Sequence, residues 1–458
     1  MRQKTQLDLA FPPTAKGEAR SPGAAGTEAR AARVATESLA AGGPSMEAIV
    51  ERDNLRKALV QVRRNKGAPG IDGITVDDLA AHLKDHWPTI KAQLLEGVYQ
   101  PLPVRRVEIP KASGGTRPLG IPTVLDRFIQ QAALQVLQAD WDPTFSEHSH
   151  GFRPGRSAQG AVRAAQAYIA AGDRYVVDID LEKFFDRVNH DILMGLVAKL
   201  VADRRILRLI RGFLSAGVLA DGLVGPTDEG TPQGGPLSPL LSNLMLDVLD
   251  RELERRGHRF ARYADDCNIY VRSRRAGERV MATVQRFLAR RLKLKVNAAK
   301  SAVDRPSRRR FLGFSFTAGK EPRRRIAPQA LARFKSRVRE LTRRTRGASL
   351  ARIVDELSRY LVGWRGYFGI CETPSVLRSL DQWVRRRLRA IAWKQWKRGR
   401  IRFAELRRRG VGKDLAAQTA GSPHGPWRLS NSPALTIAIP NASLETLGLA
   451  TVASQQAA

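Results

Sequence analysis

The chain has 458 residues, 43% of them hydrophobic, which is enough to bury a sizeable core and to form two to four domains. Its 78 lysines and arginines exceed the 44 acids to give a net charge of +34, and its two cysteines exclude a disulfide framework or a cysteine-based zinc site. Because the sequence has no apolar run of about 18 residues and no apolar leader, the charge predicts a nucleic-acid partner rather than a membrane, and a soluble intracellular protein.

The expected elements alternate between helices and short strands after a low-complexity start. Residues 1–45 are rich in Ala, Gly, Thr and Pro and are predicted to be disordered. A helix-like stretch at 46–65 opens the folded part. Further along, the apolar pattern predicts helices at 124–138 and 239–255 and strands at 174–180, 260–263, 267–271 and 311–316.

The composition changes near residue 320. Residues 321–410 contain 26 Lys/Arg and seven Asp/Glu, a charge of +19, with apolar residues at helical spacing. Residues 411–458 form a neutral tail, punctuated by Pro and Ser, with little pattern. We therefore expect four regions, and the third is expected to be helical and basic: 1–45, 46–318, 319–410 and 411–458.

Two acidic segments are candidates for a metal centre. Asp180 ends the predicted strand 174–180, where Ile179 offers a backbone carbonyl, and Asp265 and Asp266 occupy a tight turn between two predicted strands. Phosphoryl transfer commonly uses two divalent ions, and such hard ions need carboxylate oxygens held on rigid elements. Each segment alone is more often turn chemistry or a helix cap. Asp178 and Asp186 are interpreted as structural, with Asp186 capping the next helix.

The order and spacing of the two segments favour a metal centre over turn chemistry and helix caps. A strand ending in Asp180, followed 85 residues later by Tyr-Ala-Asp-Asp, resembles motifs A and C of reverse transcriptases. The resemblance implies an α+β right-hand polymerase with fingers and palm, followed by an all-helical basic thumb or maturase domain. It implies that Asp180 and Asp265 are the metal ligands, with Asp266 an adjacent one, beside the Ile179 carbonyl. Two Mg²⁺ ions are expected, because the ligands are hard and magnesium is abundant. The activity implied is RNA-directed DNA polymerisation.

Further segments match the nucleotide-binding motifs of that family. Phe185 lies where an aromatic ring beneath the incoming sugar would collide with a 2′-hydroxyl, and Gln233-Gly234 lies in a Pro-Gln-Gly segment resembling motif B. Lys111 and Arg117 flank a glycine turn that resembles the fingers hairpin over the triphosphate. Lys300 matches the motif D lysine, a general acid or charge clamp at the pyrophosphate. Without the resemblance, Phe185 would fit core packing equally well, and the segments around Lys111, Arg117 and Gln233 would more often be ordinary solvated loops.

The remaining segments are similar to the group II intron branch of the family, which is bacterial and intron-encoded. The segments are 121–127, 150–157, 361–368 and 383–397, and the resemblance covers roughly residues 50–410. It implies as partners an intron RNA that the protein helps to splice, an RNA template, a DNA primer, dNTPs and a target DNA, in a bacterial cytoplasm and on the nucleoid. The RNA-binding candidates are Arg153, Arg156, Trp364, Arg365, Arg385, Arg386, Arg387, Arg389, Lys394 and Lys397.

Two other interpretations stay open. One is a host-adapted reverse transcriptase no longer tied to an intron, and the other is a splicing cofactor with an inactive polymerase. After Cys371 the sequence has no pair of cysteines and no cluster of histidines. We therefore expect no endonuclease domain of the kind many relatives carry. The primer would then come from elsewhere, for example a replication fork, and residues 411–458 could contact DNA. The particular RNA, the DNA target, the priming route and the oligomeric state stay undetermined.

Overall fold

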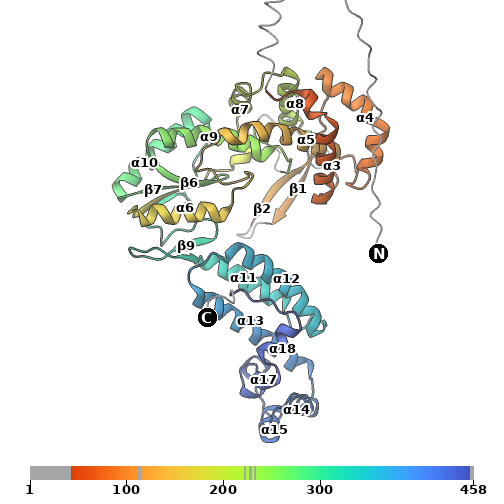
Figure 1. Ribbon diagram of the computed structural model, residues 1–458, viewed down its shortest axis with the longest axis vertical. Coiled ribbons are helices and arrows are strands. Elements are labelled where there is room, and N and C mark those ends of the chain that lie inside the picture. Colours follow the sequence, from red (N-terminus) through yellow and green to blue (C-terminus); the bar gives the residue numbers. More distant parts are fainter. Residues whose placement is uncertain (1–42, 111–114, 221–222, 226–228, 232–233, 454–458) are drawn as a thin grey trace, which may run out of the picture.

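The computed structural model describes residues 43–110, 115–220, 223–225, 229–231 and 234–453. The predictions for residues 1–42, for Lys111 and for Gln233 lie outside these described residues, as does the side chain of Arg117. Figure 1 shows an upper body of helices and sheets and, below it, a body built mainly of helices. In the described part, no helix is both long enough and apolar enough to cross a bilayer.

The N-terminal part of the upper body is helical around one sheet. The helices are α2 (Met46–Ile49), α3 (Arg52–Asn65), α4 (Leu79–Glu96) and α5 (Val124–Trp141), and the strand order is β2–β1–β4–β5. These strands are β1 (Val104–Pro110), β2 (Thr116–Ile121), β4 (Val218–Ala220) and β5 (Leu223–Gly225). The predicted helix at 46–65 is two helices, because Glu51 adopts an extended backbone and caps α3 by accepting the Asn54 N–H.

A second sheet forms the palm of the upper body, in the order β6–β7–β3–β8. Its strands are β3 (Tyr175–Ile179), β6 (Arg259–Tyr263), β7 (Asp266–Val271) and β8 (Ala302–Asp304). The associated helices are α6 (Ala158–Ala170), α7 (His190–Val197), α8 (Arg204–Ser215), α9 (Ser238–Arg255) and α10 (Arg274–Phe287). Shorter turns of helix lie at Asp142–Thr144, Phe184–Asp186 and Leu288–Leu292. The expected strands and helices of this region are therefore present, with ends shifted by a few residues.

Strand β3 has two different faces because its side chains alternate. Val177 and Ile179 are buried in a large hydrophobic core that also contains residues of α5, α9 and α10. The other face carries Val176, Asp178 and, one residue past the strand, Asp180. The palm sheet therefore presents carboxylates on the side away from this core.

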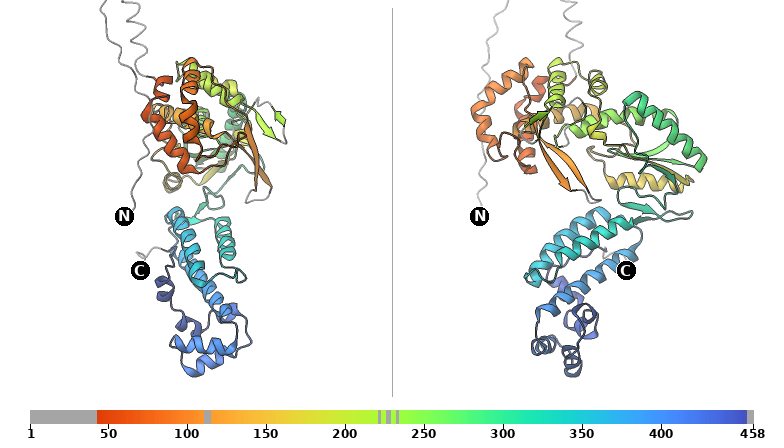
Figure 2. Two further views of the ribbon diagram at one scale, coloured as in Figure 1. Left: turned by 90° about the vertical axis from the view of Figure 1, so that its right-hand side faces the viewer. Right: turned by 180° about the vertical axis from the view of Figure 1, so that it is seen from behind.

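The lower body begins with a two-stranded ribbon, β9 (Phe314–Phe316) and β10 (Arg324–Ile326), and continues as helices. These are α11 (Pro328–Leu341), α12 (Leu350–Phe368), α13 (Pro374–Gln395) and α14 (Gly399–Arg408). The region expected to be all-helical thus starts with a strand. Figure 2 shows the same lower body from two further sides, below the palm.

A shared core joins the two bodies. Ala161 and Val162 of α6 and Tyr270 of β7 belong to the same buried cluster as Phe314 of β9 and Leu361 of α12. Polar contacts follow the same path, since the Gln159 side chain donates to the Gly366 carbonyl at 3.4 Å. Helix α6 therefore joins the palm to the lower body. The composition shift near residue 320 falls between β9 and β10, where the Gln166 side chain of α6 donates to the Pro322 carbonyl.

The C-terminal segment is folded, unlike the patternless tail that its sequence suggested. It forms α15 (Lys413–Ala420), α16 (Pro426–Leu429), α17 (Pro433–Ala438) and α18 (Asn441–Thr446). Leu435, Leu444 and Val452 are buried in the core of the lower body, and Asp381 of α13 accepts the backbone N–H groups of Val452 at 2.8 Å and Ala453 at 3.0 Å. These helices are too short for apolar periodicity to reveal them.

Candidate active site

The register of β3 against β7 brings the two acidic segments together. The strands are antiparallel, and Ile179 pairs with Cys267, so the next position places Asp180 opposite Asp266. Tyr263 pairs with Asp266 across the β6–β7 hairpin, which leaves Ala264 and Asp265 as its two-residue turn. Residues 85 positions apart in sequence, Asp180 and Asp265, therefore meet at one end of the palm sheet.

Asp178 lies on the same sheet face as Asp180 and is held by an arginine. Arg309 donates through Nη2 to Asp178 Oδ2 at 2.6 Å and to the Lys300 carbonyl at 2.6 Å. The carboxylate of Asp178 is thereby engaged with Arg309 beside the acidic centre. Arg309 was not singled out from the sequence, because its partner is 131 residues away and basic residues surround it.

The carboxylates are close enough to perturb one another. The pKa of Asp266 is raised to about 7. The largest cause is desolvation of the charged carboxylate, although part of the residue faces solvent. The negative charges of Asp265, Asp178 and Asp180 raise the pKa further. A divalent cation would relieve this repulsion, so the donor set suits a hard metal ion.

In the described residues, no three His, Cys, Asp or Glu side chains are gathered closely enough to hold an ion alone. Mg²⁺ sites in nucleotide enzymes use one or two carboxylates, with substrate phosphates and water completing the shell. The residues present therefore fit an ion whose binding depends on substrate.

The segment around Lys300 runs along Asp180. The Asp180 carbonyl accepts the Asn297 N–H at 2.8 Å, and the Asp180 N–H donates to Ser301 Oγ at 3.0 Å. Lys300 Nζ lies 3.5 Å from Asp180 Oδ1, and its side chain is 65% exposed. This ammonium stands at the open side of the acidic centre, free to turn toward a bound anion.

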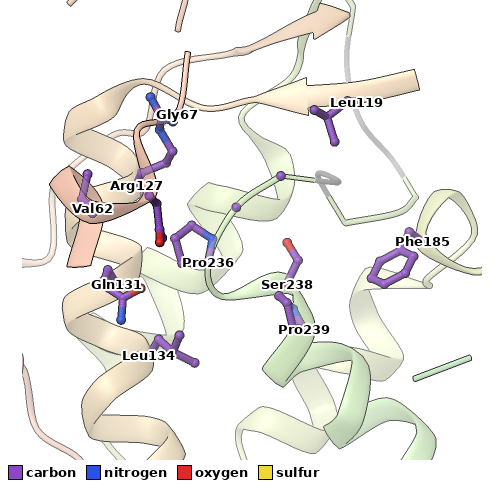
Figure 3. A pocket seen from close by; sticks show the side chains of 13 residues that line it. Val62, Gly67, Leu119, Arg127, Gln131, Leu134, Phe185, Pro236, Ser238 and Pro239 are labelled. Carbon is purple, nitrogen blue, oxygen red and sulfur yellow. The ribbon is translucent and has the colours of Figure 1, made fainter. Parts of the chain in front are cut away.

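Phe185 lies on the wall of a cavity of about 480 Å³, half-buried and reachable from it. Figure 3 shows its ring across the cavity from Gln131 and Leu134 of α5, with Pro236 and Ser238 between them. The ring also lines a second cavity of about 230 Å³. A side chain at this point can contact a ligand in either space.

The loop before α9 forms part of that wall. Gly234 has φ +146°, and a Cβ there would lie 2.5 Å from the Gly120 carbonyl oxygen of β2. Only glycine allows this loop to pack so closely on strand β2. The loop thus connects β2 to the cavity that Phe185 lines.

Asp186 does not cap the following helix. The N-cap of α7 is Asn189, whose side chain accepts the Ile192 N–H at 3.0 Å, while Asp186 lies in the preceding helical turn. The cap is therefore three residues later than predicted. Asn and Asp are comparably good caps, so residue type alone does not distinguish position 186 from position 189.

Three of the ten RNA-binding candidates are packed inside the protein. Arg153 is 7% exposed and donates to Asp142 Oδ1 at 2.8 Å, and Arg389 is 9% exposed and donates to the Ile439 carbonyl at 2.9 Å. Trp364 is 9% exposed and packs its ring against Phe334. We correct these three predictions, because buried groups with protein partners cannot also contact RNA without local unfolding.

The other seven candidates keep some or all of the side chain accessible. Lys394, Lys397 and Arg365 are exposed. The remaining four are partly covered by protein partners: Arg156 by Glu147, Arg385 by Glu445, Arg386 by Trp427 and Arg387 by Thr342.

The sequence interpretation missed two tryptophans that lie beneath these arginines, Trp427 under Arg386 and Trp383. Trp383 is half-buried and lies beneath two guanidinium groups, that of Arg387 at 5.3 Å and that of Arg339 at 5.8 Å. The four-residue spacing of Trp383 and Arg387 on one helix could have revealed the first of these contacts.

Comparison with known proteins agrees with the motifs. A family model described as reverse transcriptase (RNA-dependent DNA polymerase) matches residues 109–316, and one described as group II intron, maturase-specific domain, matches residues 331–410. Over these two segments the chain therefore resembles reverse transcriptases of the group II intron type. The reverse transcriptase match contains Asp180, Asp265 and Lys300, and the maturase match contains Lys394 and Lys397.

Curated relatives match this chain over part of their length. Protein YkfC of Escherichia coli is 42% identical over 198 residues, 42% of this chain and 52% of that protein. Group II intron-encoded protein LtrA of Lactococcus lactis subsp. cremoris is 40% identical over 188 residues, 41% of this chain and 31% of that protein. The matched segment thus spans about half or less of each relative.

One solved structure, described as a partial Cas6-RT-Cas1--Cas2 complex, aligns at 24% identity with a TM-score of 0.35. The alignment covers 54% of this chain and 42% of that one. This structural similarity is too low to inform function.

Proposed function

We propose that this reverse transcriptase extends the 3′-hydroxyl of a DNA primer with dNTPs on an RNA template. The observation that carries the proposal is the β3–β7 register, which places Asp180 beside Asp265 and Asp266 on the palm face opposite the core. The test is extension of a DNA primer annealed to RNA by the purified full chain with dNTPs and Mg²⁺. Efficient binding of that duplex without any extension would contradict the proposal.

Reverse transcriptases use divalent metal ions, and we propose Mg²⁺ here because its ligands would be hard oxygens. Asp180 and Asp265 would hold two ions, with Asp266 and the Ile179 carbonyl as further ligands. When bound, the ions supply charge stabilisation for the attacking hydroxyl oxygen and for the departing pyrophosphate.

The chain's own residues would orient the nucleotide around that centre. Phe185 would carry the sugar, and Gln233 and Gly234 would contact the nucleotide from the loop before α9. Lys111 and Arg117 would cover the triphosphate. Lys300, already beside Asp180, would hold or protonate the pyrophosphate as it leaves.

Replacing Phe185 by valine is expected to raise ribonucleotide incorporation. Loss of the ring opens space for a 2′-hydroxyl, so the ratio of kcat/KM for dNTP to that for rNTP should fall by about 10²-fold. Single-nucleotide insertion kinetics measure this ratio. Phe184→Leu is the matched control, since Phe184 is 2% exposed and lies in the core. An unchanged ratio in Phe185→Val would remove Phe185 from the sugar site.

We also propose that the lower body binds an intron RNA, assists its splicing and supports its mobility in the bacterial cytoplasm and on the nucleoid. The match of residues 331–410 to the maturase-specific model and the charge of +19 over residues 321–410 support this. Residues 411–453 could add contacts to target DNA. The test is filter binding of a transcript of the intron that flanks the gene, with an unstructured RNA of equal length as competitor. Equal affinity for both, or no such intron, would favour a host-adapted enzyme.

Two substitutions should separate packing from RNA contact in this body. Trp364→Ala is expected to lower the free energy of unfolding by about 3–5 kcal/mol, because the indole fills the core beside Phe334. The double change Lys394→Glu with Lys397→Glu should weaken RNA binding and leave stability unchanged, since both side chains are exposed. Urea denaturation and filter binding measure the two effects. RNA binding that depends only on stability would refute the surface assignment.

A further inference from the structure

A fully buried ion pair lies behind the Asp265 turn. The side chains of Arg262 and Asp250 are 1% and 0% exposed. Arg262 binds Asp250 in a bidentate manner: Nη2 donates to Oδ2 at 2.6 Å, and Nε donates to Oδ1 at 2.8 Å. Burying two charges costs so much desolvation that a pair of this kind adds little net stability compared with apolar side chains. Its presence therefore points to a geometric role.

The remaining N–H groups of Arg262 reach the acidic turn and its surroundings. Nη1 donates to the Ala264 carbonyl at 2.9 Å and to Asn243 Oδ1 at 3.1 Å, and Nη2 also donates to Ser149 Oγ at 2.8 Å. A guanidinium has five N–H groups in a rigid plane, so these contacts use all of its donors. The planar group thus fixes a carbonyl inside the two-residue turn that carries Asp265.

That turn has a backbone which needs support. Ala264 has φ +56°, a left-handed backbone conformation that residues other than glycine rarely adopt. Gly151 covers it from the other side, where a Cβ would lie 2.3 Å from the Ala264 nitrogen. Asn243 links both supports, because its Nδ2 donates to the Gly151 carbonyl at 2.8 Å. The turn is held between Arg262 and the 149–151 segment.

The same network ties the turn to the nucleotide side of the site. Asp250 and Asn243 both belong to α9, and α9 begins at Ser238, four residues after Gly234. Gly234 belongs to the loop that lines the cavity beside Phe185. Helix α9 therefore carries Asn243 and Asp250, the partners of Arg262. Its N-terminus follows the loop that lines the cavity beside Phe185.

We propose that Arg262 is a positioning residue, which locks the Ala264 carbonyl and so aims Asp265 and Asp266 at Asp180. The inference rests on the proposed polymerase function, which it deepens by naming the device that holds the acidic turn. Arg262 touches neither substrate nor metal in this role and acts through the backbone of the turn. Loss of the network should loosen the carboxylates while the palm sheet stays paired.

The test compares Arg262→Met, Asp250→Leu and the double variant of the full chain. Each single change leaves an unpaired buried charge or acceptor, and we expect lower denaturation midpoints. In the double variant, two apolar side chains of similar size should bring the midpoint back toward that of the wild type. We expect kcat to stay about 10–100-fold low in the double variant, as for other groups that orient metal ligands, with KM for dNTP little changed.

A second readout does not depend on turnover. Mn²⁺ binding to the full chain with a chain-terminated primer–template and dNTP, followed by electron paramagnetic resonance, should weaken about 10–100-fold in the double variant. Arg262→Lys keeps the charge but cannot make the planar set of contacts, so it should show the same defects even if Arg262→Met fails to fold. Arg205→Met is the control and should change neither readout, since Arg205 of α8 pairs with Asp203 and with Glu47 of α2, outside the palm sheet.

The outcomes separate the two claims. If the wild type does not extend a primer, the proposed function fails whatever the variants do. If the wild type is active and the double variant recovers kcat and Mn²⁺ binding together with stability, the pair is merely structural and the inference is overturned. Recovered stability with persistent loss of both readouts, in the double variant and in Arg262→Lys, supports it.

Discussion

Asparagine at position 180 or 265 should lower the single-turnover rate of primer extension by about 10³-fold or more, a loss of about 4 kcal/mol of transition-state stabilisation. Asparagine keeps the shape of the carboxylate and removes its charge, so ion binding should weaken while the fold persists. Asp180 lies just after β3 and Asp265 in the β6–β7 turn, and neither position is part of the hydrophobic core. Rapid-quench extension on an RNA template, with enzyme in excess, measures the rate.

A matched carboxylate controls for general charge effects. Asp304 lies on β8 of the same sheet, pairs with Val176 and is therefore several residues from Asp180 along the strand direction. Asp304→Asn should leave the rate within about twofold, because a change at a half-buried position away from the site has little effect on the reaction. Rates close to wild type in Asp180→Asn or Asp265→Asn would refute the assignment of that residue to the metal centre.

RNA binding by the full chain should weaken by about 10³–10⁵-fold when salt rises from about 50 to about 200 mM, if about six to ten phosphates are contacted. The reason is the release of counterions from the RNA as lysine and arginine side chains neutralise its phosphates. The charge of +19 over residues 321–410 supplies the cations. Filter binding at a series of salt concentrations gives the slope of the logarithm of affinity against the logarithm of salt.

Single substitutions should locate those contacts. Lys394→Ala and Lys397→Ala remove exposed cations, and each should reduce the magnitude of the slope by about one while weakening binding to all RNA sequences alike. Arg153→Ala provides the contrast, because its guanidinium is committed to Asp142 and should affect stability instead. A salt-independent affinity would contradict a surface that binds the phosphate backbone.

The sequence predicted the local features of the centre well. Strand 174–180 corresponds to β3 (Tyr175–Ile179), and the acidic turn lies between β6 and β7 as the alternation of apolar residues indicated. These features follow from neighbouring residues, which is why periodicity and turn chemistry find them. The pairing of β3 with β7 was implied only by the family resemblance, because nothing local specifies which strands meet.

Contacts between distant segments were beyond the sequence. Arg309 and Asp178 are 131 residues apart, and Ser149 and Arg262 are 113 apart, in a chain with 78 basic residues to choose among. For the same reason a count of charges could not show that Arg153 and Arg389 are buried while Lys394 is exposed. Burial depends on the packing of whole elements. The sequence around a basic residue does not show whether that residue is buried or exposed.

The region after residue 320 shows a related limit. Its composition suggested a separate helical domain, but the region begins with β10, which pairs with β9 before residue 320, and its core continues into α6 of the palm. The short helices after residue 411 carry too few turns for a helical pattern, although their apolar side chains complete the same core. Composition thus located the change of charge and missed the continuity of packing.

The most direct measurement counts Mn²⁺ ions bound per chain in a complex with a chain-terminated primer–template and dNTP. We predict two bound ions for the wild type, and fewer for Asp180→Asn and Asp265→Asn at the same free Mn²⁺ concentration. The same number of ions bound with the same affinity in all three proteins would contradict a metal centre built on these two carboxylates.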